Sequence, residues 1–207
     1  MGHRFFNSEV GIWRFFGWVG EIVMLSLLWV LCSVPFITMG ASSTALYDTV
    51  SHVTRRKEND LFSRFFGTFR RELKTACLTT LLWAAVTAVL LFLYRAVANT
   101  GQDGKVISGI SMLFLILLYF LLCVLSWVFP LLSRFTFRFS ELNRTALHIA
   151  LGNILRSALM ALLFGAGIAL ILRNYLAVFF VPGLTAWLSS FLIEPVFEKY
   201  TDISPAD

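Results

Sequence analysis

The residues best suited to chemistry lie where a long apolar stretch is interrupted. No charged residue occurs from Ile22 to Tyr47, and a proline followed by small hydroxyl-bearing residues breaks this run of 26. A helix that restarts inside a membrane offers free N–H groups and a positive dipole end to a polar ligand. The candidate ligand or helix-break site consists of Pro35, Gly40, Ser42, Ser43, Thr44 and Tyr47. The alternative is an ordinary turn at the membrane surface, in which a hydroxyl caps the next helix.

Two carboxylates form a second group of candidates. Glu21 stands near the start of the first apolar run and Glu194 at the end of the last. An ionisable group at membrane depth is costly and is often functional. Alternatively, both lie close enough to an interface to reach water or a basic residue. The candidate partners are Arg95 and Arg173 for Glu21, and Arg71, Lys74 and Arg156 for Glu194.

Signatures of enzymes and of metal sites are missing from the sequence. It contains no HExxH, GxSxG or phosphate-binding GxxxxGK[ST] motif. The histidines and cysteines show no metal-ligand spacing, and the cysteines fall in apolar runs, as small buried side chains do. These residues are His3, His52, His148, Cys32, Cys77 and Cys123. We therefore predict no enzymatic activity, no metal and no cofactor.

The composition indicates an integral membrane protein. Of the 207 residues 58% are hydrophobic and only 14% charged, with a mean hydropathy of +0.79. Soluble domains carry about 25% charged residues. The net charge of +5 fits basic segments beside anionic lipid better than nucleic-acid binding. The lipid bilayer is the expected partner, and nucleic acid is not.

The pattern of apolar runs predicts an all-α, polytopic membrane protein with about five transmembrane helices plus amphipathic interfacial helices. Crossing a hydrocarbon layer about 30 Å thick takes about 20 apolar residues. The whole chain, residues 1–207, forms one domain, with predicted spans at 17–39, 75–95, 106–133, 152–173 and 174–194.

Finer features position these spans. A short amphipathic segment is expected over residues 4–16, and a basic amphipathic segment over 44–74 on the cytoplasmic side. One of Ser42, Ser43 and Thr44 should cap the helix that follows the break, and the fourth span should extend backward through 147–155. Pro182-Gly183 should kink the fifth span. Ala161, Gly165 and Ala169, spaced by four, should form a smooth packing face.

The distribution of lysine and arginine predicts the orientation. With five crossings, one side carries twelve of these residues and the other carries five. Because the cytoplasmic side carries the excess, the C-terminus is expected in the cytoplasm and the N-terminus outside, in a bacterial cytoplasmic membrane. The alternative is a first run that turns back near residues 35–40 without crossing.

The broken stretch also resembles a known family, the YesL-like bacterial membrane proteins of unknown function. The resemblance rests on residues 27–50, with a Pro–x–x–Thr–x–Gly–Ala core, and on residues 65–77 and 182–200. Members are generally linked to sugar uptake and glycan utilisation. The resemblance therefore implies an accessory component of carbohydrate ABC import, with permease subunits or a second copy as candidate partners and a sugar as a candidate ligand. It brings no catalytic residues. The alternative is a stand-alone small-solute transporter or channel that uses the broken helix at 35–47.

Overall fold

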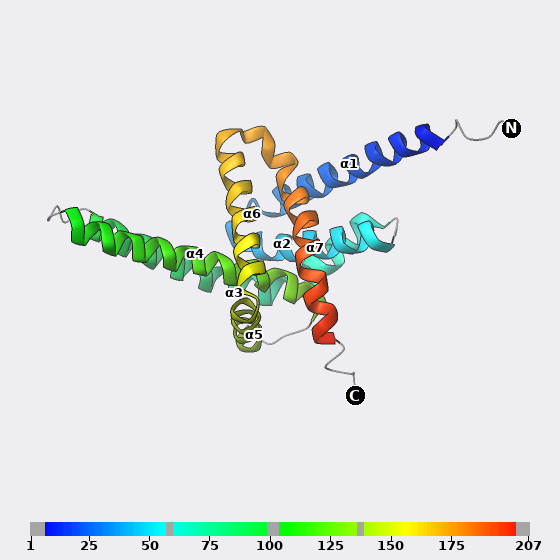
Figure 1. Ribbon diagram of the computed structural model, residues 1–207. Coiled ribbons are helices and arrows are strands. Elements are labelled where there is room, and N and C mark those ends of the chain that lie inside the picture. The colour runs from blue at the N-terminus through cyan, green and yellow to red at the C-terminus, as the bar shows by residue number, and fades with distance from the viewer. Residues whose placement is uncertain (1–6, 57–59, 99–103, 136–138, 202–207) are drawn as a thin grey trace.

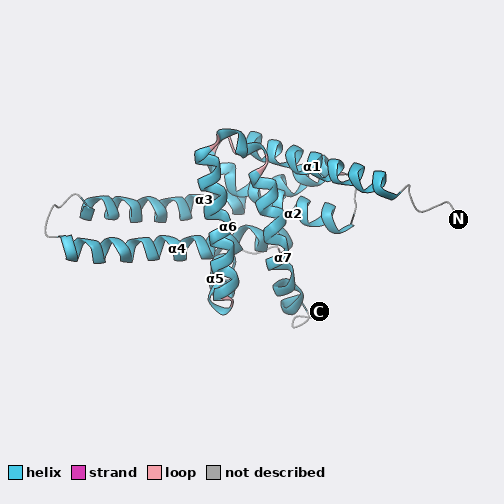
Figure 2. Cartoon of the chain, turned by 45° about the horizontal axis from the view of Figure 1, so that its top comes forward, coloured by secondary structure: helices cyan, strands magenta, loops and turns pink. Residues whose placement is uncertain are grey.

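The computed structural model describes residues 7–56, 60–98, 104–135 and 139–201, and within them all regular structure is helical (Figures 1 and 2). The elements are α1 (Asn7–Cys32), η1 (Phe36–Thr38), α2 (Met39–Arg56), α3 (Leu61–Ala98), α4 (Gly104–Arg134), α5 (Phe139–Gly152), α6 (Ile154–Arg173), η2 (Tyr175–Phe179) and α7 (Val181–Thr201). The all-α prediction is confirmed.

Long apolar helices mark the protein as a membrane protein. Among the described residues three stretches are long and apolar enough to cross a bilayer: Leu61–Val97, Gly109–Arg134 and Ile154–Arg173. Two shorter apolar stretches, Phe16–Cys32 and Val181–Phe197, complete the set. Each of the five overlaps one predicted span, with different bounds, and the number that cross the membrane stays a prediction.

The polar helix α2 lies at the centre of the fold, which corrects the expectation that residues 44–74 form a surface segment. From Gly40 to Ser51 only Ser43 is not fully buried, and α2 contacts α1, α3, α4 and α7. The hydroxyl groups are accommodated because they bond to the helix itself. Thr44 Oγ1, for example, donates to the carbonyl of Gly40 at 2.9 Å, and Thr49 Oγ1 to that of Ala45 at 2.8 Å.

A long antiparallel hairpin of α3 and α4 projects from this core (Figures 1 and 2). The basic helix expected before the second span is continuous with that span in α3, which has 38 residues. At 1.5 Å per residue α3 is about 57 Å long, nearly twice the hydrocarbon thickness. It is thus longer than one crossing requires, and its first half exposes Arg70 and Arg71. In the same way, the described part of the expected interfacial segment and the first predicted span form one continuous helix, α1.

The chain bends before α6 and again before α7. Asn153 (φ −129°, ψ 51°) separates α5 from α6, so the fourth span does not extend backward as expected. Pro182 and Gly183 do not kink the last helix, because they open it: α7 begins at Val181. Proline is tolerated in a first turn, where its missing N–H is not needed.

Two glycines allow the last helix to pack closely. A Cβ on Gly183 would lie 2.8 Å from the carbonyl oxygen of Ile22, and the Gly183 N–H donates to Ser26 Oγ at 2.9 Å. On α6 the close approach uses Gly167, where a Cβ would lie 3.1 Å from side-chain atoms of Val181 and Thr185. Gly165, on the face expected to pack, has open space around it.

Candidate functional site

The predicted helix break exists, and it lies between α1 and α2. Pro35 is exposed and precedes the 3-10 turn η1, with ψ of 113°. The Thr38 hydroxyl lies 2.6 Å from the carbonyl oxygen of Cys32 and 2.7 Å from that of Pro35. A helix end leaves its last carbonyls without intrahelical partners. Thr38 thus satisfies the carbonyl at the end of α1 and closes the turn.

The three hydroxyl residues predicted as caps lie inside α2, which begins earlier, at Met39. Ser42 Oγ is 2.6 Å from Ser33 Oγ and bonds to the carbonyl of Thr38, while Thr44 bonds to that of Gly40. Ser43 donates to the carbonyl of Met39 at 2.7 Å and accepts the indole N–H of Trp29 at 3.0 Å. The capping interpretation is therefore corrected: these hydroxyls tie α2 to itself and to the end of α1.

Gly40 is required for packing. It is the second residue of α2, and its φ lies outside the left-handed region. A Cβ at this position would collide with Thr80 Oγ1 and would lie 2.7 Å from Phe129 Cε1 and 3.1 Å from the carbonyl oxygen of Ala76. The glycine therefore lets α2 approach α3 and α4 closely.

A cavity of about 220 Å³ lies among α1, α2, α4, α6 and α7. Of the six predicted site residues, Ser43 and Tyr47 line it, and the other four do not. Trp29 lines it from α1, Phe129 from α4 and Ile168 from α6. Five helices from distant parts of the chain thus enclose a space beside the predicted break.

The lining of the cavity is mainly apolar, and three of its hydroxyl groups bond to their own helices. Ser126 Oγ donates to the carbonyl of Cys123 at 2.7 Å, Thr185 Oγ1 to that of Pro182 at 2.9 Å, and Ser189 Oγ to that of Ala186 at 2.8 Å. Among the described residues, none of those that line the cavity is charged. It can therefore hold an apolar group and offers a ligand only acceptor oxygens from these three residues.

A buried carboxylate that the sequence analysis missed joins α2 to α3. Asp48 is 4% exposed, and its Oδ2 accepts bonds from Arg64 Nε at 3.1 Å and Thr68 Oγ1 at 2.8 Å. His52 Nδ1 lies 3.4 Å from the other carboxylate oxygen. The sequence did contain a signal for this buried carboxylate: Asp48 is the one charged residue among the apolar and hydroxyl-bearing residues 41–50. We call the Asp48, Arg64 and Thr68 group the α2–α3 clasp.

Comparison with known proteins identifies one region of the chain. Residues 22–94 match the family described as "Protein of unknown function, DUF624". The match covers about a third of the chain. The resemblance to the YesL-like proteins is thereby confirmed, because they belong to the same domain family. Neither the curated proteins nor the solved structures yield a match.

The DUF624 region covers the second half of α1, the break, α2 and most of α3. It contains Gly40 and the whole α2–α3 clasp. It contributes only one side of the cavity, including Trp29, Ser43 and Tyr47, because the remaining walls come from α4, α6 and α7. The DUF624 match therefore includes the buried central helix α2 and also much of the projecting helix α3.

Within the DUF624 region, Ser51, His52 and Asp48 bring together the residue types of a hydrolase triad. Ser51 Oγ lies 3.5 Å from His52 Nδ1, and Asp48 Oδ1 lies 3.4 Å from the same nitrogen. A catalytic relay needs the nucleophile and the carboxylate on opposite ring nitrogens. Ser51 is also buried and donates to the carbonyl of Asp48. This arrangement stabilises α2 and does not activate a nucleophile.

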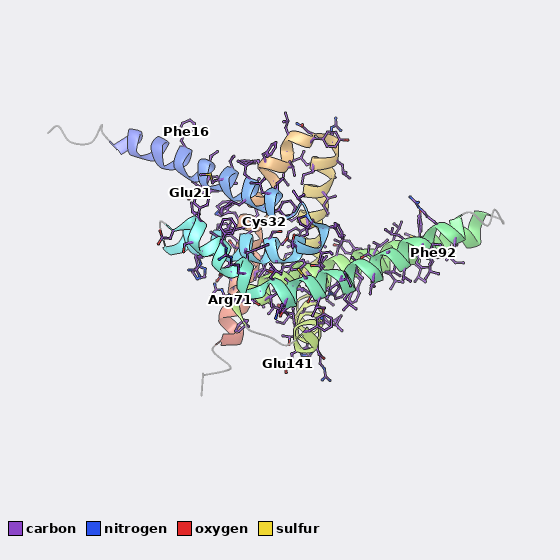
Figure 3. The ribbon with its side chains drawn as sticks, turned by 180° about the vertical axis from the view of Figure 1, so that it is seen from behind. Phe16, Glu21, Cys32, Arg71, Phe92 and Glu141 are labelled. Carbon is purple, nitrogen blue, oxygen red and sulfur yellow. The ribbon has the colours of Figure 1, made fainter. Side chains whose placement is uncertain are left out.

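The two predicted carboxylates have different surroundings. Glu194, on α7, is 2% exposed, and both its oxygens lie 2.5 Å from Arg134 Nη2 at the end of α4. Arg134 was not among the three predicted partners, and it meets Glu194 because the end of α4 approaches α7. Glu21 is half-buried on α1 (Figure 3). Among the described residues, no ion pair joins it to Arg95 or Arg173.

Proposed function

We propose that this protein is an accessory membrane subunit that works beside a carbohydrate ABC importer in a bacterial cytoplasmic membrane. The DUF624 match and the YesL-like resemblance support this role, because YesL-like proteins are generally linked to sugar uptake. In this proposal the protein binds permease subunits and catalyses no reaction.

The observation that carries the proposal is the projecting α3–α4 hairpin. In the most apolar stretch of α3, only 11% of the residues are buried by the rest of the protein. Phe92, near the tip, is 72% exposed (Figure 3). Ala85 and Ala88 on the same helix are also exposed, and small residues allow a neighbouring membrane helix to approach closely. The hairpin thus offers a large intramembrane surface for a partner helix.

The cavity chemistry supports binding of a partner over transport of sugar by this chain alone. A sugar carries many hydroxyl groups, and burying them without hydrogen bonds is costly. The cavity is lined by apolar side chains, and the hydroxyls of Ser126, Thr185 and Ser189 already donate to their own helices. A carbohydrate in this space would therefore leave most of its polar groups unsatisfied.

Co-purification tests the proposed role. The tagged full-length protein, extracted from its host in mild detergent, should recover ABC permease subunits detectable by mass spectrometry. An Ala85→Phe/Ala88→Phe variant should lose them, because added bulk on the hairpin blocks close helix approach. Ala166→Phe, at an exposed alanine of α6, is the matched control and should retain them. Absence of permease subunits with the wild-type protein would refute the proposal, and so would equal recovery with the hairpin variant.

A stand-alone transporter is the second candidate, favoured by one observation: Ser43 and Tyr47, beside the broken α1–α2 junction, line the cavity. Purified protein in vesicles should then take up a labelled small solute without any partner. Ser43→Ala should reduce that uptake without preventing insertion. Vesicles that take up no more solute than empty ones would exclude this candidate for the solutes tested.

The proposed orientation places the N-terminus outside and the C-terminus in the cytoplasm. Substitution of Lys57 and Asp103 by cysteine, in a chain whose natural cysteines are replaced by alanine, allows labelling with an impermeant thiol reagent. Both positions lie outside the described residues. Asp103→Cys should react from outside and Lys57→Cys only after permeabilisation. Reaction of both from the same side would exclude the five-span arrangement.

A further inference from the structure

The cavity among α1, α2, α4, α6 and α7 has no role in the proposed partner binding. We propose that it binds one acyl chain of a bilayer phospholipid. This inference goes beyond the proposed function and does not depend on it.

Hydrocarbon suits this space better than water does. The cavity holds about 220 Å³ and is lined mainly by aliphatic and aromatic side chains. A cavity of about 150 Å³ with a lining of this kind stays dry and binds apolar molecules. A buried water molecule needs two to four polar partners, whereas Ser126, Thr185 and Ser189 donate to their own helices and Ser43 is engaged by Trp29.

The surroundings of the cavity identify a phospholipid as the source of the chain. The cavity is not fully enclosed, and two of its lining residues, Ile168 and Met39, are 51% and 36% exposed. Because Ile168 lies on the long apolar helix α6, one of the three able to cross a bilayer, we infer that the cavity opens toward hydrocarbon beside this residue. A free fatty acid would bring a carboxylate, and the described residues that line the cavity include no basic one to pair with it. A phospholipid acyl chain can enter while its headgroup stays at the membrane surface.

Photo-crosslinking tests the inference. The full-length protein is reconstituted in vesicles of phosphatidylethanolamine and phosphatidylglycerol that contain a phospholipid with a diazirine on one acyl chain. After irradiation, peptide mass spectrometry locates the adducts. We expect adducts on Ser126 or Ser189, which line the cavity but are 5% and 0% exposed. Surrounding lipid should label only exposed residues such as Leu162. Adducts confined to such exposed residues would overturn the proposal.

Substitutions on α6 provide matched controls. Ile168→Trp narrows the opening and should abolish the cavity adducts, whereas Leu162→Trp, at a residue 66% exposed outside the cavity, should leave them unchanged. Phe164→Ala enlarges the cavity and should increase them. Equal cavity labelling in all three variants would overturn the proposal.

A second probe distinguishes the source of the chain. A diazirine-bearing free fatty acid at the same molar ratio should label the cavity less than the phospholipid does. Stronger labelling by the fatty acid would overturn the assignment to phospholipid.

Discussion

Gly40→Ala tests the packing of α2 against its neighbours with a single added carbon. In the native structure a Cβ at this position would collide with Thr80 Oγ1 and would crowd Phe129 Cε1 at 2.7 Å and the carbonyl oxygen of Ala76 at 3.1 Å. The Thr80 hydroxyl donates to that same carbonyl at 2.8 Å, so it cannot rotate away without losing a hydrogen bond. The carbonyl belongs to the backbone of α3 and cannot yield locally.

Two opposing terms determine the size of the effect. Adding carbon to a well-packed interior typically costs about 1–3 kcal/mol. Replacing glycine by alanine inside a helix gains up to about 1 kcal/mol. We therefore expect Gly40→Ala to lower the free energy of unfolding by roughly 1–2 kcal/mol. For a chain of this length each kcal/mol lowers the melting temperature by about 2–4 °C. Gly40→Val should cost more, because it adds two further methyl groups.

Thermal unfolding of the purified protein in detergent provides the measurement. Gly67→Ala is the matched control, because Gly67 lies within α3 with no neighbouring atom within 4 Å of an added Cβ, and it should melt at or above the wild-type temperature. Thr80→Ala should partly restore stability to Gly40→Ala, since it removes the colliding hydroxyl. If Gly40→Ala melted as high as the wild type, or Thr80→Ala gave no recovery, the packing argument would be wrong.

Three further substitutions address the polar contacts of the interior, and each is measured by thermal unfolding. Ser43→Ala should cost about 1 kcal/mol, because the half-buried indole N–H of Trp29 loses its acceptor. Arg134→Ala should cost about 2–3 kcal/mol of unfolding free energy, less than the 3–5 kcal/mol of a fully buried pair, because the Arg134 side chain is 34% exposed. Glu194→Gln should cost less, because the amide oxygen still accepts a hydrogen bond from Arg134. A larger loss for Glu194→Gln than for Arg134→Ala would contradict the ion-pair account. Asp48→Asn should lower the melting temperature measurably, whereas the control Asp60→Asn, at an exposed residue, should not. Equal changes in melting temperature for the two variants would refute a structural role for the α2–α3 clasp.

The sequence predicts the class of fold well, because bilayer thickness sets the length of an apolar run irrespective of packing. It locates the helix break near Pro35 for a similarly local reason, since proline disfavours continuation of a helix. It does not predict the central position of α2. A helix with Asp48, His52 and several hydroxyls has the composition of a surface segment, and only the neighbours that bury it decide otherwise. Likewise, a serine near a helix start can either cap it or bond back to a carbonyl one turn earlier, and Ser43 does the latter.

Contacts between distant segments account for what the sequence leaves open. Arg134 and Glu194 are 60 positions apart, and their meeting depends on how α4 crosses α7. The cavity likewise requires five helices to converge, and its lining residues, such as Trp29 and Ile168, are individually ordinary for membrane spans. No local pattern marks either feature, so neither could be predicted without the fold.

The distribution of polar contacts bears on what this interior can recognise. The α2–α3 clasp lies within the DUF624 region, and the Arg134–Glu194 pair joins α4 to α7 outside it. Elsewhere in the interior, hydroxyls such as those of Ser126 and Ser189 donate to their own helices. The interior therefore satisfies much of its own polarity without a ligand. Selection of a molecule in the cavity must then depend on shape and on access past Ile168, which favours a hydrocarbon chain over a solute recognised by charge.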